Sequence, residues 1–494
     1  MTRFHPNPNG SETPPLRSWV LGMCLLAVIP PCNGPLAAAA AAVVDPVVEA
    51  EEDVYSYTGA QNGAGPMWCS GSTSLARVGD RVFAAGLETI PDAQPLNNCR
   101  WMLFVRENDG WTRVRVDADG RTREPSPIAA FPDGRVFVSV NPTLGKGPEP
   151  NGGPARPDVL QFNADDLTAA PVSLAPAWQG EPDFREHSYR TFVADGARGE
   201  LLLFQNIGYT HAEWTLRDGA GKWSAQGRLK WPWDAAHRKP GPIRVCYPDV
   251  ALRDRAVHFV GVSDVIEPNP DWRAFKRELT GREWDYDFRR LFYTWTPDVA
   301  KQPFAEWVEI ASREATAGHV QPGDLWLAPN GDAHLIWTER AIDERLREKF
   351  FPDAKQSEQL NYAVVRGGKV VKRRTIMEAL GSSSGLSGAA SRFHVTPDNR
   401  LFVVYRIFDD GKDGRRTIEN RIVEILLDGA TGEPVRIPFK KPFTNFFTNT
   451  VRAGSPPSWT LEMLGECGRV PNTISYARVN LNPRISSPPQ PTRP

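Results

Sequence analysis

The sequence predicts an all-β fold, a seven-bladed β-propeller of four-stranded antiparallel blades. Seven segments repeat one pattern: a strand, a tight polar turn and a second, hydrophobic strand. They begin at Ser72, Ser126, Ser188, Pro248, Gly323, Ser391 and, in a degenerate copy, Thr450. Asp-Gly, Asn-Gly or Asp-Asn occupies several of the turns, as in hairpins that need a positive φ. The spacing of the copies leaves room for one four-stranded sheet each, the unit of a propeller.

The composition fits one large domain built from these repeats. Sixteen Trp and 23 Phe stand among 494 residues, of which 40% are hydrophobic, and such residues suit flat sheets packed face to face. The net charge is −1, with acidic and basic residues mixed along the chain. The charge therefore predicts no nucleic-acid partner and no attraction to an anionic membrane. We expect a monomer.

The N-terminal segment has the pattern of a signal peptide. Trp19–Ile29 is an apolar stretch too short to span a bilayer alone, and small residues suited to cleavage follow it. An uncleaved anchor is the alternative. We expect a secreted or periplasmic protein without membrane attachment after cleavage. The expected parts are a signal peptide (1–42), a mobile leader (43–53), the propeller (54–480) and a disordered Pro-rich tail (481–494).

Export would place the four cysteines that follow the expected signal peptide in an oxidising compartment, where disulfides form. Cys69 and Cys99 both belong to the first blade, so we expect a disulfide between them. Cys246 could pair with Cys467. No CxxC or Cys-His spacing of a zinc site occurs, and we expect no metal and no cofactor.

The second hairpin of several blades carries an Asp, one or two Gly and then a Trp, as in Asp109-Gly-Trp111 and Asp218 to Trp223. These turns resemble the Asp-boxes of BNR-repeat, sialidase-like propellers, in which the Asp caps the turn and the Trp packs between blades. The match is imperfect, because the first turn is contracted and the Gly of the second comes one place late. Asp-boxes are structural, so the resemblance implies a fold and no activity.

Two insertions, Glu267 to Asp287 and Ala341 to Glu358, have a charged, helix-like composition. Each is expected between the second and third strands of a blade, on the rim where the first strands begin. Long loops on a repeat scaffold often shape a binding face, although solvated loops without a role are the alternative.

Polar residues precede or begin the first strand of each repeat, where a propeller usually binds ligands at its channel mouth. Together they form a candidate site, unless they are merely solvated rim residues. The positions are Ser70 or Ser72, Glu124, His187, Tyr247 with Arg244, His319, Ser384 through Ser387, Arg392, and Asn449 with Arg452. Those expected to bind substrate are Glu124, His319, Arg392, Asn449 and Arg452.

Two segments, Glu186-His-Ser-Tyr189 and Arg244-Val-Cys-Tyr-Pro248, are similar to segments of the BNR-type polysaccharide lyases, the ulvan-lyase propellers. The resemblance implies that His187 and Tyr247 serve proton abstraction next to a uronate carboxylate, which Arg244 neutralises. The arginine departs from the family pattern, in which it follows the tyrosine on the next strand. Val257–Val262 offers only His258 there.

The sequence therefore predicts an exported propeller that recognises an extracellular acidic polysaccharide and cleaves it by β-elimination. One alternative is a non-catalytic propeller that binds a glycan or a protein. Another is a sialidase-like glycoside hydrolase, whose carboxylates could come from Glu124, Glu186 and Asp249; the only Arg-Ile-Pro segment is Arg436–Pro438. The lyase hypothesis requires His187 and Tyr247 to converge on one rim, with Arg244 and His319 as the nearest cations.

Overall fold

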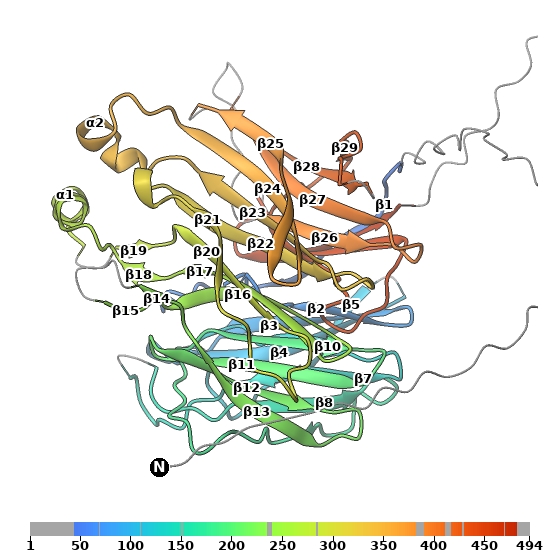
Figure 1. The fold of residues 1–494 in the computed structure, drawn as a ribbon. Helices are drawn as coiled ribbons and strands as arrows, with labels where there is room; N and C mark the ends of the chain where they lie inside the picture. The colour runs from blue at the N-terminus through green and yellow to red at the C-terminus, as the bar shows by residue number, and fades with distance from the viewer. Residues whose placement is uncertain are drawn as a thin grey trace, which may run out of the picture. The chain divides into compact units, whose positions relative to one another are not determined.

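Seven four-stranded antiparallel sheets surround one axis, which confirms the predicted β-propeller (Figure 1). The structure is a computed structural model. It describes residues 44–481 except 69, 109, 150–151, 235–239, 283–284, 382–389, 411–415, 427–428 and 469, and it does not describe the side chains of 409 and 410. The expected signal peptide and almost all of the expected tail lie outside this range. No helix within it is long and apolar enough to cross a membrane.

Blades 1 to 6 each run outward from the axis in chain order, and neighbouring blades bury both faces of most inner strands. Blades 1 to 3 consist of β2 (Leu75–Val78), β3 (Arg81–Thr89), β4 (Cys99–Glu107) and β5 (Gly110–Val116); β6 (Ile128–Ala130), β7 (Arg135–Val140), β8 (Asp158–Asn163) and β9 (Val172–Ser173); and β10 (Arg190–Asp195), β11 (Glu200–Ile207), β12 (His211–Arg217) and β13 (Trp223–Lys230).

Blades 4 to 6 follow the same order. They consist of β16 (Val245–Arg253), β17 (Ala256–Ser263), β20 (Arg290–Thr296) and β21 (Val308–Ser312); β22 (His319–Leu327), β23 (Ala333–Arg340), β24 (Ser357–Arg366) and β25 (Lys369–Leu380); and β26 (Ser391–Val395), β27 (Leu401–Asp410), β28 (Arg416–Ile425) and β29 (Val435–Ile437). Two short ribbons lie beside blade 4: β14 (Trp233–Asp234) with β15 (Gly241–Pro242), and β18 (Val265–Ile266) with β19 (Tyr286–Asp287).

The seventh blade joins the two ends of the propeller. Its strands are β30 (Phe443–Thr448), β31 (Thr460–Cys467), β32 (Thr473–Asn480) and β1 (Val47–Ser56), and β1 pairs with β32 along its length. The expectation of a mobile leader over 43–53 is therefore wrong for Val47–Asp53. This segment looks like a polar linker because acidic residues line its exposed face, but its backbone completes the hydrogen bonding of the outermost strand pair.

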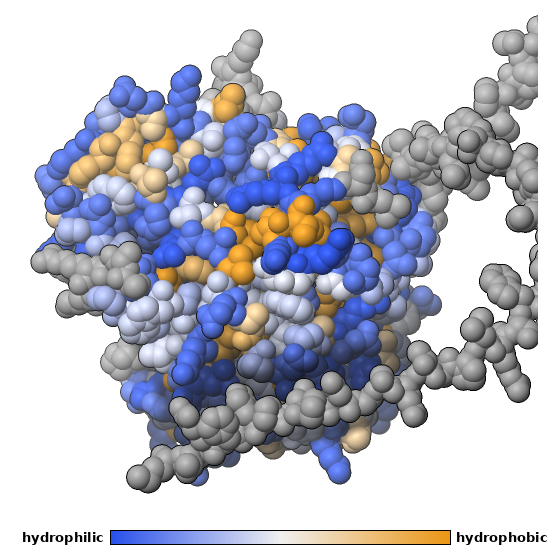
Figure 2. Space-filling view, in the orientation of Figure 1, coloured by the Kyte–Doolittle hydropathy of each residue, from blue (hydrophilic) through white to orange (hydrophobic). Residues whose placement is uncertain are grey.

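The two insertions form helices, as their composition indicates, and contact each other. They contain α1 (Pro270–Thr280), the 3₁₀ turn η2 (Glu344–Leu346) and α2 (Arg347–Phe350). Buried Lys276 of α1 joins them, because its Nζ lies 2.6 Å from Glu267 and 3.4 Å from Asp343. The Trp272 and Phe351 rings also meet, with centroids 5.5 Å apart. Apolar surface gathers over these two helices (Figure 2).

One capped turn has the geometry expected of the second hairpins. Asp218 Oδ1 accepts hydrogen bonds from the backbone N–H groups of Ala220 and Lys222, both at 3.0 Å. Trp223 Nε1 donates to Leu174 O, at the outer edge of the preceding blade, at 2.8 Å. The corresponding Asp109 lies outside the described residues.

The pairing of Cys246 with Cys467 is not formed: Cys99, Cys246 and Cys467 are buried and are not joined to one another by a disulfide. Cys69, the expected partner of Cys99, lies outside the described residues. Cys99 lies beside Asn62, whose side-chain amide is 3.5 Å from the sulfur. Burial raises the pKa of the Cys99 thiol to about 11, so it stays protonated at neutral pH.

Two loop segments fill the propeller axis. From one end, Ser72 Oγ donates to Arg190 O of blade 3 at 2.9 Å. From the other, the loop between β30 and β31 bonds to inner strands across the axis: Ala194 N donates to Arg452 O at 2.9 Å, and Ala130 N to Ala453 O at 2.8 Å. Among the described residues these two segments therefore occupy the axis, and a ligand site is expected on a rim.

Buried ion pairs tie these segments to the blades. Arg452 lies 2.6 Å from Asp324 and 3.2 Å from Asp249, and it donates to Gly71 O at 3.1 Å. Arg392 donates to Ser70 O at 2.9 Å. Both arginines are almost fully buried. The prediction that Arg392 and Arg452 bind substrate is therefore wrong, because backbone carbonyls and carboxylates inside the axis occupy their guanidinium groups.

Candidate functional site

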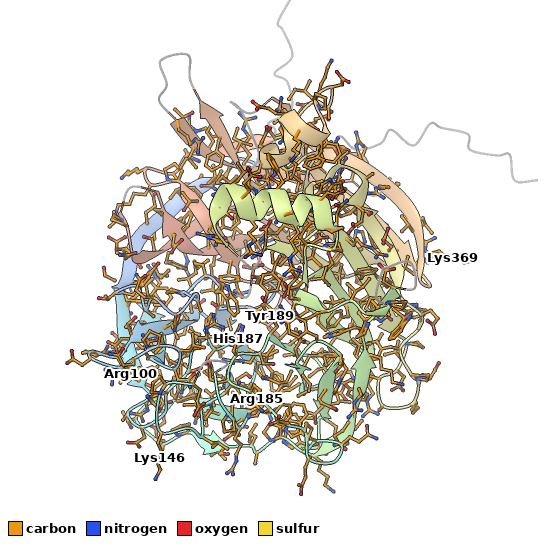
Figure 3. The ribbon with its side chains drawn as sticks, turned by 90° about the vertical axis from the view of Figure 1, so that its left-hand side faces the viewer. Arg100, Lys146, Arg185, His187, Tyr189 and Lys369 are labelled. Carbon is orange, nitrogen blue, oxygen red and sulfur yellow. The ribbon has the colours of Figure 1, made fainter. Side chains whose placement is uncertain are left out.

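A cluster of rings lies on the rim where the inner strands begin, between blades 3 and 4. Figure 3 looks onto this rim, with His187 and Tyr189 near its centre and α1 above them. Trp68 and Tyr189 stack at 5.1 Å between centroids, and the Tyr247 ring meets Tyr189 edge-on at 5.0 Å. Trp68 also approaches His187 at 5.9 Å and Tyr247 at 6.1 Å. His187 and Tyr247 thus lie on neighbouring blades, on one rim, beside a shared aromatic floor formed by Trp68 and Tyr189.

Tyr247 has an unusual backbone conformation. Its φ is 48°, in the left-handed region that non-glycine residues rarely adopt. It lies where the pairing of β16 with β17 shifts register, between Cys246 and Asp249, and such bulges often redirect a side chain next to an active site. Strain of this kind costs on the order of 1–3 kcal/mol and clusters at functional sites.

Gly71 packs against the carbonyl side of this bulge. A Cβ added at Gly71 would lie 2.2 Å from Pro248 O and 2.8 Å from Tyr247 O. Only glycine therefore lets the segment that follows Trp68 cross so close to the Tyr247 backbone. The close approach of Gly71 to the backbone of Tyr247 and Pro248 therefore positions both the aromatic floor and the bulge.

His187 bonds to a buried carboxyl group. Its Nδ1 is 3.0 Å from Glu124 Oε1, and Arg123 Nη1 also contacts Nδ1. The imidazole is 34% exposed, whereas the Glu124 side chain is 0% exposed. Burial, and then the charge of Arg123, lower the pKa of His187 to about 4. His187 is consequently neutral at pH 7, with Nε2 on the ring edge away from Glu124.

Two buried carboxyl groups, Glu124 and Glu186, lie behind His187. Glu124 accepts from Ser188 N at 3.2 Å, and Glu186 accepts from Thr122 Oγ1 at 3.0 Å. Burial raises the pKa of Glu124 to about 8. Burial, and then the charge of Glu124, raise the pKa of Glu186 to about 7.

These positions correct two predictions. Glu124 does not face a ligand, because it lies beneath His187, so it is not a substrate-binding residue. Glu186 and Asp249 are as deeply buried, and Asp249 pairs with Arg452 inside the axis. None of the three carboxyl groups can therefore flank a bound glycosidic bond as a glycoside hydrolase requires.

Arg244 lies beside the aromatic floor, but its charge is already paired. It forms an ion pair with buried Asp264, and its guanidinium lies 5.5 Å from the Tyr189 ring centroid. Burial disfavours the charged form, yet Asp264 and nearby groups hold the pKa of Arg244 above its usual value. Arg244 is thus a permanent cation next to the floor, at a position that the sequence identified.

The remaining predicted residues lie farther from the floor. His319 touches the Phe288 ring at 5.9 Å, and Phe288 in turn lies 5.9 Å from Tyr247. Burial lowers the pKa of His319 to about 4, so it is not the cation that the sequence suggested. Ser384 through Ser387 lie outside the described residues.

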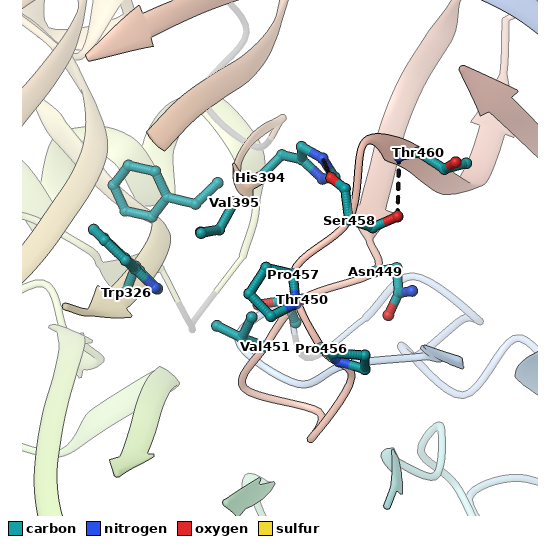
Figure 4. Close-up of a pocket in the computed structure, with 11 residues that line it drawn as sticks. Trp326, His394, Val395, Asn449, Thr450, Val451, Pro456, Pro457, Ser458 and Thr460 are labelled. Atoms are coloured by element: carbon teal, nitrogen blue, oxygen red, sulfur yellow. Dashed lines mark hydrogen bonds between the residues drawn. The ribbon is translucent and has the colours of Figure 1, made fainter. Parts of the chain in front are cut away.

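Asn449 is not at this site. It follows the end of inner strand β30, at the opposite end of the axis, and its amide donates to Glu462 Oε2 at 2.6 Å. Figure 4 draws the small pocket there, which Asn449 lines together with Trp326 and His394. The prediction failed because the seventh hairpin was taken to begin at Thr450, whereas β30 ends at Thr448.

Three residues of the site, Trp68, Arg123 and Asp264, are not among those predicted from the sequence. Arg123 directly precedes Glu124, and its guanidinium lies 5.3 Å from the Trp68 ring centroid. Trp68 comes just before the first repeat and Asp264 just after β17, so both occupy connections that meet this rim. No group of three or more potential metal ligands occurs in the part of the chain that the structure describes.

Replacing Glu124 with glutamine should change how stability depends on pH. The folded-state pKa of Glu124 is raised from 4.5 to about 8. Between these values the folded state holds a proton that the unfolded state releases, so this group makes the unfolding free energy fall as pH rises. In Glu124→Gln this contribution is lost, and the variant should gain stability relative to wild type as pH rises through that window.

Urea unfolding at stepped pH values measures this difference. Glu213→Gln is a matched control, since Glu213 is also buried beside a histidine, His211, at 3.1 Å. A difference between wild type and Glu124→Gln that stays constant with pH would contradict the assignment.

No protein-family model and no curated protein matches this sequence. Solved structures do superpose on it. A polysaccharide lyase, Uly1, has a TM-score of 0.48 and 11% identity, covering 88% of this chain and 94% of its own. An α-L-arabinanase from Penicillium chrysogenum has a TM-score of 0.39 and 13% identity, covering 72% and 92%. A puromycin-hydrolysing peptidase from Mycobacterium tuberculosis has a TM-score of 0.43 and 11% identity, covering 88% and 57%.

Proposed function

We propose that this protein cleaves an acidic polysaccharide by β-elimination at the rim between blades 3 and 4. The observation that carries the proposal is the convergence of neutral His187 and backbone-strained Tyr247 beside one aromatic floor. Side chains that can move protons, held next to the partly exposed ring of Trp68, suit a substrate made of sugar rings.

In the proposed step, His187 Nε2 takes the proton from the carbon next to a uronate carboxylate. The electrons of that C–H bond form the new double bond, and the bond to the glycosidic oxygen breaks. The Tyr247 hydroxyl gives its proton to the leaving oxygen, and solvent then returns His187 and Tyr247 to their starting states. Positive charge from Arg123 and Arg244 favours the developing negative charge on the substrate.

Glu124 would set the tautomer of His187. A protonated Glu124 donates to Nδ1 and leaves the proton on Nε2, which then cannot act as a base. Arg123 Nη1 also contacts Nδ1, and because a guanidinium can only donate, this contact likewise favours the proton on Nε2. An ionised Glu124 would pair with Arg123, accept from Nδ1–H and free the Nε2 lone pair. Turnover should therefore rise as Glu124 ionises, near pH 8.

A non-catalytic glycan-binding propeller is the second candidate. The ion pair between Arg244 and Asp264 favours it, because the cation expected to neutralise the substrate carboxylate already has a carboxylate partner. The aromatic floor would serve binding equally well in this case.

The test is a panel of acidic polysaccharides, assayed for the ultraviolet absorbance of the unsaturated uronate that β-elimination leaves. We expect absorbance with at least one polysaccharide, and at least about a hundredfold loss in His187→Asn. His211→Asn is the matched control, since His211 also bonds to a buried glutamate, Glu213, but does not border the aromatic floor. Silence across the panel, with glycan binding intact, would favour the binding module.

A further inference from the structure

Two exposed tyrosines lie beside the aromatic floor. Tyr209 belongs to the turn between β11 and β12 and is 47% exposed, and Tyr286 belongs to β19 and is 36% exposed. Their hydroxyl oxygens are 3.2 Å apart. Blade 3 and the blade 4 insertion thus contribute one ring each to a single surface, which we call the tyrosine shelf.

Arg244 holds both rings from below. Its guanidinium lies 3.9 Å from the Tyr209 centroid and 5.7 Å from the Tyr286 centroid. The guanidinium is itself fixed by its ion pair with Asp264. Cation–π contacts and the bond between the hydroxyls therefore position the two rings before any ligand arrives, which reduces the entropy lost on binding.

The shelf is continuous with the aromatic floor. The same guanidinium lies 5.5 Å from Tyr189, which stacks on Trp68. Rings therefore extend from His187, across the floor, to the exposed shelf.

We propose that the tyrosine shelf is a subsite for a further sugar ring of the same polysaccharide chain. A pyranose presents an apolar C–H face edged by hydroxyl groups, which matches an exposed aromatic face edged by phenol oxygens. A folded protein partner fits less well, because two rings offer far less area than a stable protein interface requires. The subsite rests on the proposed polysaccharide substrate but does not require that the substrate be cleaved.

Electrophoresis through gels that contain each polysaccharide of the panel tests the subsite without using turnover. The wild-type protein should be retarded by at least one polysaccharide. The double variant Tyr209→Ala/Tyr286→Ala should bind that polysaccharide about tenfold more weakly or worse, whereas Tyr209→Phe/Tyr286→Phe should keep most of the affinity through its rings. Leu380→Ala, at an exposed residue on β25, is the control, and urea unfolding checks that each variant is folded.

The outcomes separate the subsite from the lyase. Both proposals are supported if His187→Asn is retarded by the polysaccharide but does not cleave it, and if the double alanine variant is no longer retarded. Retardation that depends on the shelf in a protein that cleaves nothing supports the subsite and contradicts the lyase. Equal retardation of wild type and the double alanine variant, or no retardation of wild type by any polysaccharide, overturns the subsite.

Discussion

Tyr247→Phe is expected to lower turnover of an acidic polysaccharide by about a hundredfold to ten-thousandfold, because it removes the proton that the leaving oxygen requires. The phenyl ring keeps the edge contact with Tyr189. The hydroxyl accepts a long hydrogen bond from Tyr189, at 3.5 Å, and the side chain is half-buried, so the free energy of unfolding should fall by about 1 kcal/mol or less.

Two measurements on the same preparations test these two effects. The absorbance of the unsaturated product gives the turnover, and urea unfolding gives the stability. Tyr57→Phe is a suitable control, since the Tyr57 hydroxyl bonds to Glu466 at 2.6 Å on blade 7, and it should keep full turnover. If Tyr247→Phe also keeps full turnover, Tyr247 is not the acid. If it loses turnover only in proportion to lost stability, Tyr247 is a structural residue.

The repeat pattern predicted the fold and placed His187 and Tyr247, which the resemblance to the lyase propellers singled out, on one rim. In a propeller, equivalent positions of each repeat lie at equivalent heights, so His187 and Tyr247 had to share a rim. Strand spacing also fixed the place of the two insertions, where α1 and α2 were found. These inferences needed only the order and register of the strands.

The direction of a side chain at that height could not be predicted in the same way. Glu124 and His187 both precede inner strands, yet one is fully buried beneath the other. Burial depends on partners from other blades, such as Asp324 for Arg452, which are far apart in sequence and have no fixed spacing. The role of β1 was hidden for a different reason, because its partner β32 lies at the opposite end of the chain.

Arg452→Leu is expected to reduce the free energy of unfolding by about 3–5 kcal/mol, because it leaves two buried carboxyl groups without their cation. Asp249 and Asp324 are 1% and 0% exposed in their side chains. The Arg452 guanidinium also donates to Gly71 O at 3.1 Å, so the segment beneath Trp68 loses a contact as well. The aromatic floor should therefore loosen along with the axis.

The loss in Arg452→Leu should grow with pH. Burial already raises the pKa of Asp249 to about 7, although Arg452 lowers it. Without the arginine this folded-state pKa rises further, so the folded variant retains a proton that the unfolded chain releases, and its stability falls as pH rises through that window.

Urea unfolding of Arg452→Leu, with exposed Arg436→Leu as the control, measures both effects. Adding Asp324→Asn should restore part of the stability, because one buried charge is then removed. A loss below about 1 kcal/mol, or one that shrinks as pH rises, would mean that the arginine does not hold the axis through its charge.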